Sequence, residues 1–360
     1  MEEFFCKTKL LSGSGSVAAL KELNSRRLFV VTDPFFEKNG TAKSLAALSG
    51  AGEIHIYSEV KPDPTVEQAA RGAAALKAFE PDTVVALGGG SAMDLAKAMV
   101  FFSGLKVNFA AVPTTSGSGS EVTDFAILTH EGVKHPLIDE KLCPHVAILD
   151  SDLLRELPRG LIADTGFDVL SHALEAFVAT GAGAVTDALA QDAFASAMEA
   201  LLRSYQGDLS VRQKMHTASA MAGMAFTRAG LGLCHAMSHA LGGMFHLPHG
   251  RLNGILLPAV IRVNSAVAGK KYADLARKAG FSGTADTVAV RNLQNGLIRL
   301  RKALGMPATL VQAGCEIGHI HQLTGQICKA AAADPCCQTN PVPVTEALVR
   351  GVLEEVTGHV

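Results

Sequence analysis

The chain has 360 residues, more than one domain usually holds, which suggests two domains. Its composition, 48% hydrophobic and 18% charged, excludes a mainly disordered protein, and a formal charge of -2 offers no basic surface for nucleic acid or a membrane. No apolar run of about 18 residues predicts a membrane span, and the first residues lack the basic and long apolar parts of a secretory signal. We therefore expect a globular cytoplasmic protein whose 7 scattered cysteines are reduced.

The first part of the chain alternates short apolar runs with helical patterns. The runs that predict buried strands are residues 28–32, 53–57, 83–87, 109–112 and 146–149. Residues 65–79 and 91–102 carry apolar side chains every three to four positions, which is typical of packed helices. Strands and helices that alternate in this way predict a mostly parallel sheet with helices on both faces.

The second part of the chain is predicted to be helical, because its β-branched runs nearly vanish. Helical spacing covers residues 164–180, 185–204, 214–245, 272–278, 288–304 and 345–356. A proline and several charges interrupt the pattern between residues 150 and 160. We therefore predict one domain over residues 1–157 and a second over residues 158–360.

A glycine turn joins the strand at residues 83–87 to the helix that follows it. Gly88, Gly89, Gly90 and Ser91 stand at this junction. Glycines let backbone amides approach a ligand closely, and the amino end of a helix carries partial positive charge, so the turn suits a pyrophosphate. The alternative is a tight turn in which Ser91 is an ordinary N-cap.

An aspartate, Asp33, follows the strand at residues 28–32. A usual dinucleotide fingerprint places its acidic ribose ligand some 20 residues after the glycines, whereas Asp33 precedes them, so the topology is not the standard one. A carboxylate at this strand end would accept hydrogen bonds from a ribose and repel a 2′-phosphate, which favours NAD over NADP. The alternative is a turn former ahead of Pro34 that binds no ligand.

A loop rich in hydroxyl groups, residues 113–123 (PTTSGSGSEVT), lies between two further apolar runs. Its hydroxyls and flexible amides are suited to closing over a phosphate or a ribose. The alternative is a flexible polar linker, but a linker seldom lies between two buried segments.

Carboxylate and imidazole groups gather in the helical half. Asp168 and His172 are four residues apart, which places them one turn apart on one face of a helix. Downstream, an otherwise almost wholly apolar segment contains four histidines: His235, His239, His246 and His249. One carboxylate with several imidazoles suits iron, zinc, nickel or cobalt better than calcium or magnesium, and leaves a position open for substrate. The alternatives are a helix-surface Asp/His contact and hydrogen-bonded core histidines.

For several other residues the sequence gives less support for a functional role. Cys234 points about 100° away from His235 on a helix, so we interpret it as a buried thiol. Glu121 and Glu175 either support ligands or cap helices, and the sequence leaves both readings open. Four residues lack further ligands at useful spacing and are assigned no role: His319, His321, Cys336 and Cys337.

Four segments of the chain together resemble the iron-dependent alcohol dehydrogenases. They are, in order, GGGSAMDLAKA, PTTSGSGSEVT, DTGFDVLSHALEAF and CHAMSHALGGMFHLPHG. Within this family the chain is most similar to the 1-propanol dehydrogenases of propanediol-utilisation microcompartments. The resemblance implies a Rossmann-like amino domain and an all-helical carboxyl domain, as in the dehydroquinate synthase-like fold, with cofactor and metal meeting between them.

The resemblance also implies roles for particular residues. The metal ligands would be Asp168, His172, His235 and His249. His239 would stand beside the metal but not bind it. As a hypothesis, His239 is the catalytic proton relay, with a ribose hydroxyl of the cofactor as the alternative. The cofactor contacts would be Asp33, Gly89, Gly90, Ser91, Asp94, Thr114, Thr115, Ser118, Thr123, Lys134 and Leu153. Ser118 departs from the family pattern, because many members have threonine there, and serine keeps the hydroxyl with a looser rotamer.

The implied reaction is NAD-dependent interconversion of a short-chain aldehyde, such as propionaldehyde, and its primary alcohol. Fe²⁺ is the implied ion, with Zn²⁺ as the alternative because it binds such ligands more tightly. The implied partners are the small substrate and a second copy of the chain. The implied location is the cytoplasm, with a microcompartment as a further possibility, and neither nucleic acid nor membrane is expected as a partner.

Three alternatives remain open at this point. The substrate could be a polar aldehyde, such as sulfoacetaldehyde, succinic semialdehyde or 3-hydroxypropionaldehyde, with Arg228, Arg251 or His246 as its anchor. The protein could instead be a lyase of the dehydroquinate synthase type, although residues 216–258 contain few of the cations that such a substrate needs. It could also be a scaffolding protein that keeps the fold without turnover.

Overall fold

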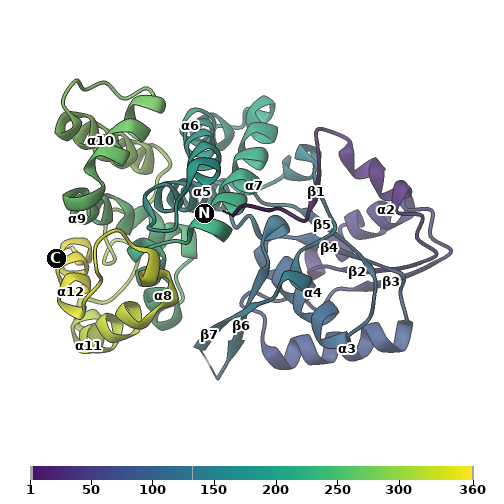
Figure 1. Cartoon of the computed structure of the whole chain (residues 1–360). Coiled ribbons are helices and arrows are strands. Elements are labelled where there is room, and N and C mark those ends of the chain that lie inside the picture. Colours follow the sequence, from purple (N-terminus) through teal and green to yellow (C-terminus); the bar gives the residue numbers. More distant parts are fainter. Residues whose placement is uncertain (1–2, 132, 359–360) are drawn as a thin grey trace. The chain divides into compact units, whose positions relative to one another are not determined.

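Six parallel strands form one sheet in the first of two compact units, Phe5–Leu157 (Figure 1). The computed structural model describes residues 3–131 and 133–358. The strands run in the spatial order β1, β8, β5, β4, β2, β3. Their bounds are β1 (Lys9–Ser12), β2 (Arg27–Val31), β3 (Glu53–Tyr57), β4 (Thr83–Gly88), β5 (Asn108–Pro113) and β8 (Val146–Leu149).

Helices pack on both faces of this sheet. They are α1 (Pro34–Lys38), α2 (Thr41–Leu48), α3 (Val66–Phe79) and α4 (Gly90–Ser103). The 3₁₀ helices of this unit are η1 (Ser16–Leu23), η2 (Ser120–Val122), η3 (Glu140–Leu142) and η4 (Ser151–Leu154). Successive residues of β2 alternate between two cores: Phe29 and Val31 belong to one, and Leu28 and Val30 to the other. A sheet with two buried faces is what the continuous apolar runs predicted, and the predicted fold class is confirmed.

The carboxyl ends of β2, β4 and β5 are neighbours, because these strands are adjacent and parallel. Gly88 at the end of β4 is in register with Pro113 at the end of β5. Asp33, the glycine turn and the hydroxyl loop therefore follow three adjacent strands at one edge of the sheet. In open α/β sheets, ligands bind outside these carboxyl ends.

A two-stranded antiparallel hairpin, β6 (Phe125–His130) and β7 (Val133–Ile138), follows the hydroxyl loop. The sequence analysis did not predict this hairpin, nor the edge strand β1. The burial pattern of β1 contains no fully buried residue, so it offered no apolar run to detect. These omissions leave the predicted parallel sheet unchanged.

The second unit, Pro158–Val360, is helical throughout its described residues. Its helices are α5 (Arg159–Val178), α6 (Ala184–Tyr205), α7 (Arg212–Ala229), α8 (Leu233–Phe245), α9 (His249–Lys278), α10 (Asp286–Ala303), α11 (Ile317–Ala333) and α12 (Glu346–Thr357), with the turns η5 (Leu209–Val211) and η6 (Pro335–Thr339). The stretch 214–245, predicted as one helical pattern, is two helices, because Gly230 has a φ of 85° and ends α7.

Helix α9 is much longer than the sequence analysis predicted. Its length and composition would suffice to cross a bilayer, but 61% of its most apolar window is buried inside the unit, as in the core helix of a globular protein. Pro258 lies within it and has no N–H for the carbonyl of Gly254. Arg301 of α10 donates to that carbonyl instead, with Nη1 3.0 Å from the oxygen. The buried arginine thus completes the hydrogen bonding of α9 at its proline.

Candidate metal centre and dinucleotide-binding edge

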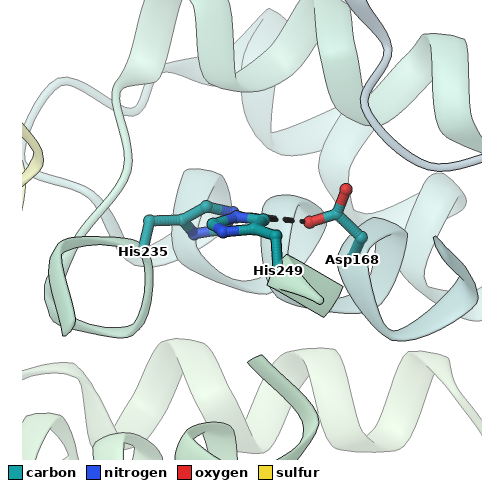
Figure 2. Close-up of side chains that lie close together, drawn as sticks. All are labelled: Asp168, His235 and His249. Atoms are coloured by element: carbon teal, nitrogen blue, oxygen red, sulfur yellow. Dashed lines mark ion pairs between the residues drawn. The ribbon is translucent and has the colours of Figure 1, made fainter. Parts of the chain in front are cut away.

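Three imidazole side chains on three helices of the second unit lie around the carboxylate of Asp168. Asp168 and His172 lie on α5, His235 on α8, and His249 is the first residue of α9. Asp168 Oδ1 lies 3.8 Å from His172 Nε2, 3.9 Å from His235 Nε2 and 3.6 Å from His249 Nε2. Figure 2 shows Asp168 facing His235 and His249. One donor atom each of Asp168, His235 and His249 lies within 4.8 Å of the other two. His172 adjoins this group through its distance to Asp168 and through its ring, which stacks on that of His235 with centroids 4.5 Å apart.

The close approach of α9 to α5 depends on a glycine beside His249. A Cβ on Gly250 would lie 1.8 Å from the carbonyl oxygen of Asp164 and 3.3 Å from Cβ of Asp168. Only glycine lets the backbones approach this closely. The first turn of α9 consequently lies against the helix that carries Asp168, and this contact places His249.

Glu175 fixes both the start of α8 and the ring of His235. Its carboxylate accepts backbone N–H groups from Gly232 at 3.0 Å, Cys234 at 2.7 Å and His235 at 3.3 Å. The same carboxylate lies 2.6 Å from His235 Nδ1. Since its oxygens already accept from the backbone, Nδ1 is the donor in this last bond, which leaves the lone pair of Nε2 directed to the cluster.

Asn253 orients the aspartate. Its Nδ2 donates to Asp168 Oδ1 at 2.9 Å, and its own Oδ1 accepts from Ser238 Oγ at 2.5 Å. Asn253 is fully buried on α9. The sequence analysis missed Asn253 and left Glu175 open, because neither has a distinctive spacing and both act through the ligands rather than as ligands.

The residues present fit a borderline divalent ion. His235 Nε2 is buried and has no hydrogen-bond partner among the residues described by the structure. Burial lowers the pKa of His235 well below its ordinary value, so the ring stays neutral, as a ligand must be. Ligands at about 2.0–2.2 Å from one tetrahedral ion lie about 3.3–3.6 Å apart, close to the spacing found here. One carboxylate with imidazoles suits iron or zinc.

His239 stands beside this cluster. Its ring stacks on that of His249 with centroids 5.2 Å apart, and its Nδ1 lies 2.8 Å from Asp334 Oδ2. Cys336, to which we assigned no role, in fact lies within ligand distance of these two residues. That assignment was incomplete, because Cys336 follows α11 and only the fold brings it to α8. Cys234 is fully buried, as predicted.

The glycine turn and the hydroxyl loop are in contact in the first unit. A Cβ on Gly89 would lie 3.2 Å from Thr115 Oγ1, and one on Gly90 would lie 3.2 Å from Ser118 Oγ. The N-cap of α4 is Gly89 and makes no side-chain bond, so the reading of Ser91 as N-cap is wrong. The first-turn N–H groups of α4 thus have no side-chain acceptor at the N-cap, which is the arrangement that suits an anion.

Asp33 serves as the N-cap of α1. Its Oδ1 accepts from the backbone N–H of Phe35 at 2.8 Å and of Phe36 at 3.3 Å. Its Oδ2 lies 3.8 Å from the point where a Cβ on Gly88 would stand. Asp33 therefore forms the turn that starts α1, and its other carboxylate oxygen faces the glycine turn.

A buried lysine connects α4 to the hydroxyl loop. Lys97 is fully buried, and its Nζ lies 3.0 Å from Ser120 Oγ, 2.8 Å from Thr123 Oγ1 and 2.8 Å from the carbonyl oxygen of Phe125. Ser120 in turn donates to Asp94 Oδ1 at 2.8 Å. Burial lowers the pKa of Lys97 to about 8. The sequence analysis did not select Lys97, since a helical lysine is usually exposed.

The remaining predicted cofactor residues are distributed around this edge. Thr114 is buried at the end of β5, and Leu153 in η4 packs against the core shared by Leu28 and Val30. Lys134 lies on the hairpin strand β7 with its Nζ 2.6 Å from Asp63 Oδ1. Thr123 is fully buried, with its hydroxyl engaged by Lys97, so its contribution is to the shape of the loop.

One unit contains a parallel sheet with a glycine turn, and the other contains a carboxylate–imidazole cluster. Together these features indicate a metal-dependent dehydrogenase. The model for the iron-containing alcohol dehydrogenases matches residues 7–151, and the model for the carboxyl-terminal part of the Fe-containing family matches residues 162–357. The chain belongs to the iron-containing alcohol dehydrogenase family, and it is an oxidoreductase.

Relatives match the chain from end to end. It is 40% identical to the 1-propanol dehydrogenase PduQ of Salmonella typhimurium, over 99% of this chain and 100% of that protein. It is 36% identical to an NADPH-dependent butanol dehydrogenase of Clostridium saccharobutylicum, over 98% of this chain and 97% of that protein. The structure of sulfoacetaldehyde reductase from Bifidobacterium kashiwanohense in complex with NAD⁺ is similar with a TM-score of 0.91 and 26% identity, covering all of both chains.

Proposed function

We propose that this protein interconverts a short-chain aliphatic aldehyde, such as propionaldehyde, and its primary alcohol, with NAD(H) and iron as cofactors. The observation that carries this proposal is the convergence of three imidazole Nε2 atoms within 3.6–3.9 Å of Asp168 Oδ1. The unit Phe5–Leu157 would bind NAD, and the unit Pro158–Val360 would bind iron and substrate. Membership of an alcohol dehydrogenase family disfavours the lyase and scaffolding alternatives.

The residues of this chain hold and orient the reacting groups. When bound, iron supplies a Lewis acid for the carbonyl oxygen, and the nicotinamide supplies or accepts the hydride. The hydrogen bond from His235 to Glu175 fixes the tautomer of His235, and the hydrogen bond from Asn253 to Asp168 fixes the rotamer of Asp168. The ligand atoms of His235 and Asp168 are thereby directed toward each other. Asp94 and the hydroxyl loop, held by Lys97, shape the cofactor edge.

His239 is proposed to move the proton that the new alkoxide needs. Asp334 accepts from His239 Nδ1, which leaves Nε2 as the atom that exchanges a proton with substrate or solvent. His239→Ala is expected to lower kcat by about a hundredfold, a typical contribution of general acid–base catalysis. Iron content should stay normal, since His239 is not among the proposed ligands. The exposed His321→Ala variant serves as the control, and an unchanged kcat for His239→Ala would remove the role.

One argument about the substrate comes from the ion pair between Arg251 and Asp164. This arginine makes two bonds to the buried Asp164, with Nε 3.2 Å from Oδ1 and Nη2 3.0 Å from Oδ2. An arginine already neutralised by a carboxylate is a poor anchor for a sulfonate or a second carboxylate. Of the three anchors considered above, Arg251 is thus already paired, and this pairing supports an uncharged aldehyde. The structural similarity to a sulfoacetaldehyde reductase keeps an anionic aldehyde as the second candidate.

An aldehyde panel tests the proposed function. Anaerobically prepared, iron-loaded protein would be assayed for NADH oxidation with propionaldehyde, acetaldehyde, 3-hydroxypropionaldehyde, succinic semialdehyde and sulfoacetaldehyde. We expect the highest kcat/KM with the uncharged short aldehydes. A preference for the anionic aldehydes would favour the second candidate, and no turnover with any of them would contradict the proposal.

Preference for NAD is proposed to depend on Asp33. Asp33→Ser keeps an acceptor that can cap α1 but removes the charge that would repel a 2′-phosphate. The ratio of kcat/KM with NADPH to that with NADH should rise at least about tenfold, which corresponds to about 1.4 kcal/mol. Asp139→Ser, which changes the capping aspartate of η3, is the matched control and should leave the ratio unchanged. Equal ratios in both variants would remove Asp33 from the cofactor site.

The assembly and location of the enzyme are also proposals. We propose that the protein is a homodimer and that it works in the cytoplasm or inside a bacterial microcompartment. The resemblance to the propanediol-utilisation dehydrogenases and the 40% sequence identity to PduQ support this proposal. Light scattering of the purified protein would measure the mass of the assembly, and a monomer at micromolar concentration would contradict the dimer.

A further inference from the structure

A second group of ligand-type side chains lies in the helical unit outside the proposed iron ligands. It consists of His239 on α8, Asp334 at the start of η6, and Cys336 within η6. One donor atom from each residue, a nitrogen, an oxygen and a sulfur, lies within 4.8 Å of the other two. No residue of this group belongs to the Asp168 cluster.

The contacts within the group centre on the carboxylate. Asp334 Oδ2 lies 2.8 Å from His239 Nδ1, and Asp334 Oδ1 accepts from the backbone N–H of Cys336 at 2.9 Å. Burial, and next the charge of Asp334, raise the pKa of the Cys336 thiol well above its ordinary value. The three donor atoms are thus close enough together for one cation to bind all of them in place of the ring proton and the thiol proton.

The donor set selects among metals. A thiolate, an imidazole and a carboxylate suit zinc, which binds sulfur, nitrogen and oxygen in tetrahedral sites, better than they suit magnesium or calcium. The side chain of His239 is 31% exposed and that of Asp334 is 15% exposed, so an ion can enter and a water can complete its coordination. The proposed iron ligands include no sulfur, so the two sites differ in chemistry.

We propose that His239, Asp334 and Cys336 form a second metal site that binds zinc and inhibits the enzyme. On binding, Cys336 releases its thiol proton to solvent, and the ring proton of His239 moves from Nδ1 to Nε2 as Nδ1 becomes a ligand. No electron is transferred. Binding of zinc depends only on the three donors, whereas inhibition rests on the proposed function, because zinc would occupy the residue proposed to relay the proton.

Cobalt reports on this site through its bond to sulfur. Iron-loaded wild-type protein would be titrated anaerobically with Co²⁺, and the ultraviolet thiolate-to-cobalt charge-transfer band would be followed. We expect the band to saturate at one Co²⁺ per chain and to be displaced by Zn²⁺. Cys336→Ala and Cys336→Ser should lack the band. Cys337→Ala is the matched control and should keep it, because the thiol of Cys337 contacts the carbonyl of Ala331 instead.

Two results would overturn the proposal. Absence of the band in the wild type, or its persistence in both Cys336 variants, would show that these three residues do not bind the ion. For inhibition, Cys336→Ala should raise the zinc concentration that halves NADH oxidation at least tenfold, with the rate of each protein normalised to its own kcat without zinc. Equal inhibition of the wild type and Cys336→Ala, with the band present, would overturn the inhibitory role while leaving both the site and the proposed function in place.

Discussion

Replacing Asp168 with alanine is expected to abolish tight iron binding and to lower aldehyde reduction by more than about a thousandfold. The physical reason is that Asp168 supplies the only carboxylate of the proposed ligand set, and its Oδ1 is the atom that faces all three imidazoles. Lewis-acid stabilisation by a metal contributes several kcal/mol, and about 1.4 kcal/mol corresponds to a factor of ten in rate. Metal analysis of the purified protein and steady-state NADH oxidation would measure both effects.

The control for this prediction is Asp192→Ala, which changes an exposed aspartate of α6 in the same unit. It should leave iron content and kcat unchanged. Circular dichroism should show the helical content of both variants to be that of the wild type, because the substitution removes one side chain and leaves the backbone of α5 intact. An Asp168→Ala protein that retained both iron and wild-type turnover would contradict the proposed metal centre.

Gly250→Ala is expected to be the most destabilising small substitution in the helical unit. Its Cβ would lie 1.8 Å from the backbone oxygen of Asp164, so α5 and α9 must move apart. Overpacking of this kind costs about 1–3 kcal/mol or more, which lowers the melting temperature by about 2–12 °C in a unit of this size. Iron content should fall as well, because the same contact places His249 against Asp168.

Gly269→Ala provides the matched comparison on the same helix. Nothing lies within 4 Å of the Cβ that it adds, so it should stabilise the protein by about 0.5–1 kcal/mol through helix propensity. Thermal melts of the three proteins, with and without iron, would measure the difference. If Gly250→Ala melted with the wild type, the close contact between α5 and α9 would not limit stability.

Local patterns were sufficient to predict the sheet, the helical half and a group of candidate metal ligands, from which the family resemblance selected four. Residues 83–87 are apolar and buried on both faces, and Asp168 and His172 share a helix, so the signal for each lies within a few neighbouring residues. The fold class, the family and the oxidoreductase activity inferred from these patterns are confirmed.

The residues that support the site could not be predicted in this way. Asn253 contacts Asp168 across 85 positions of sequence, and Cys336 reaches His239 only because η6 lies beside α8. Lys97 looks like a surface residue until the hydroxyl loop is seen to enclose it. Such roles depend on tertiary contacts, which a single sequence does not encode in any local spacing.

The pairing of Pro258 with Arg301 has a consequence for sequence variation. A proline inside a long helix is tolerated here because a guanidinium from the neighbouring helix α10 satisfies the carbonyl of Gly254. Loss of the arginine alone would leave that oxygen buried and unsatisfied, at a cost of about 1–3 kcal/mol. The two positions are thus expected to covary among homologues: where position 301 loses its guanidinium, position 258 should recover a residue with an N–H.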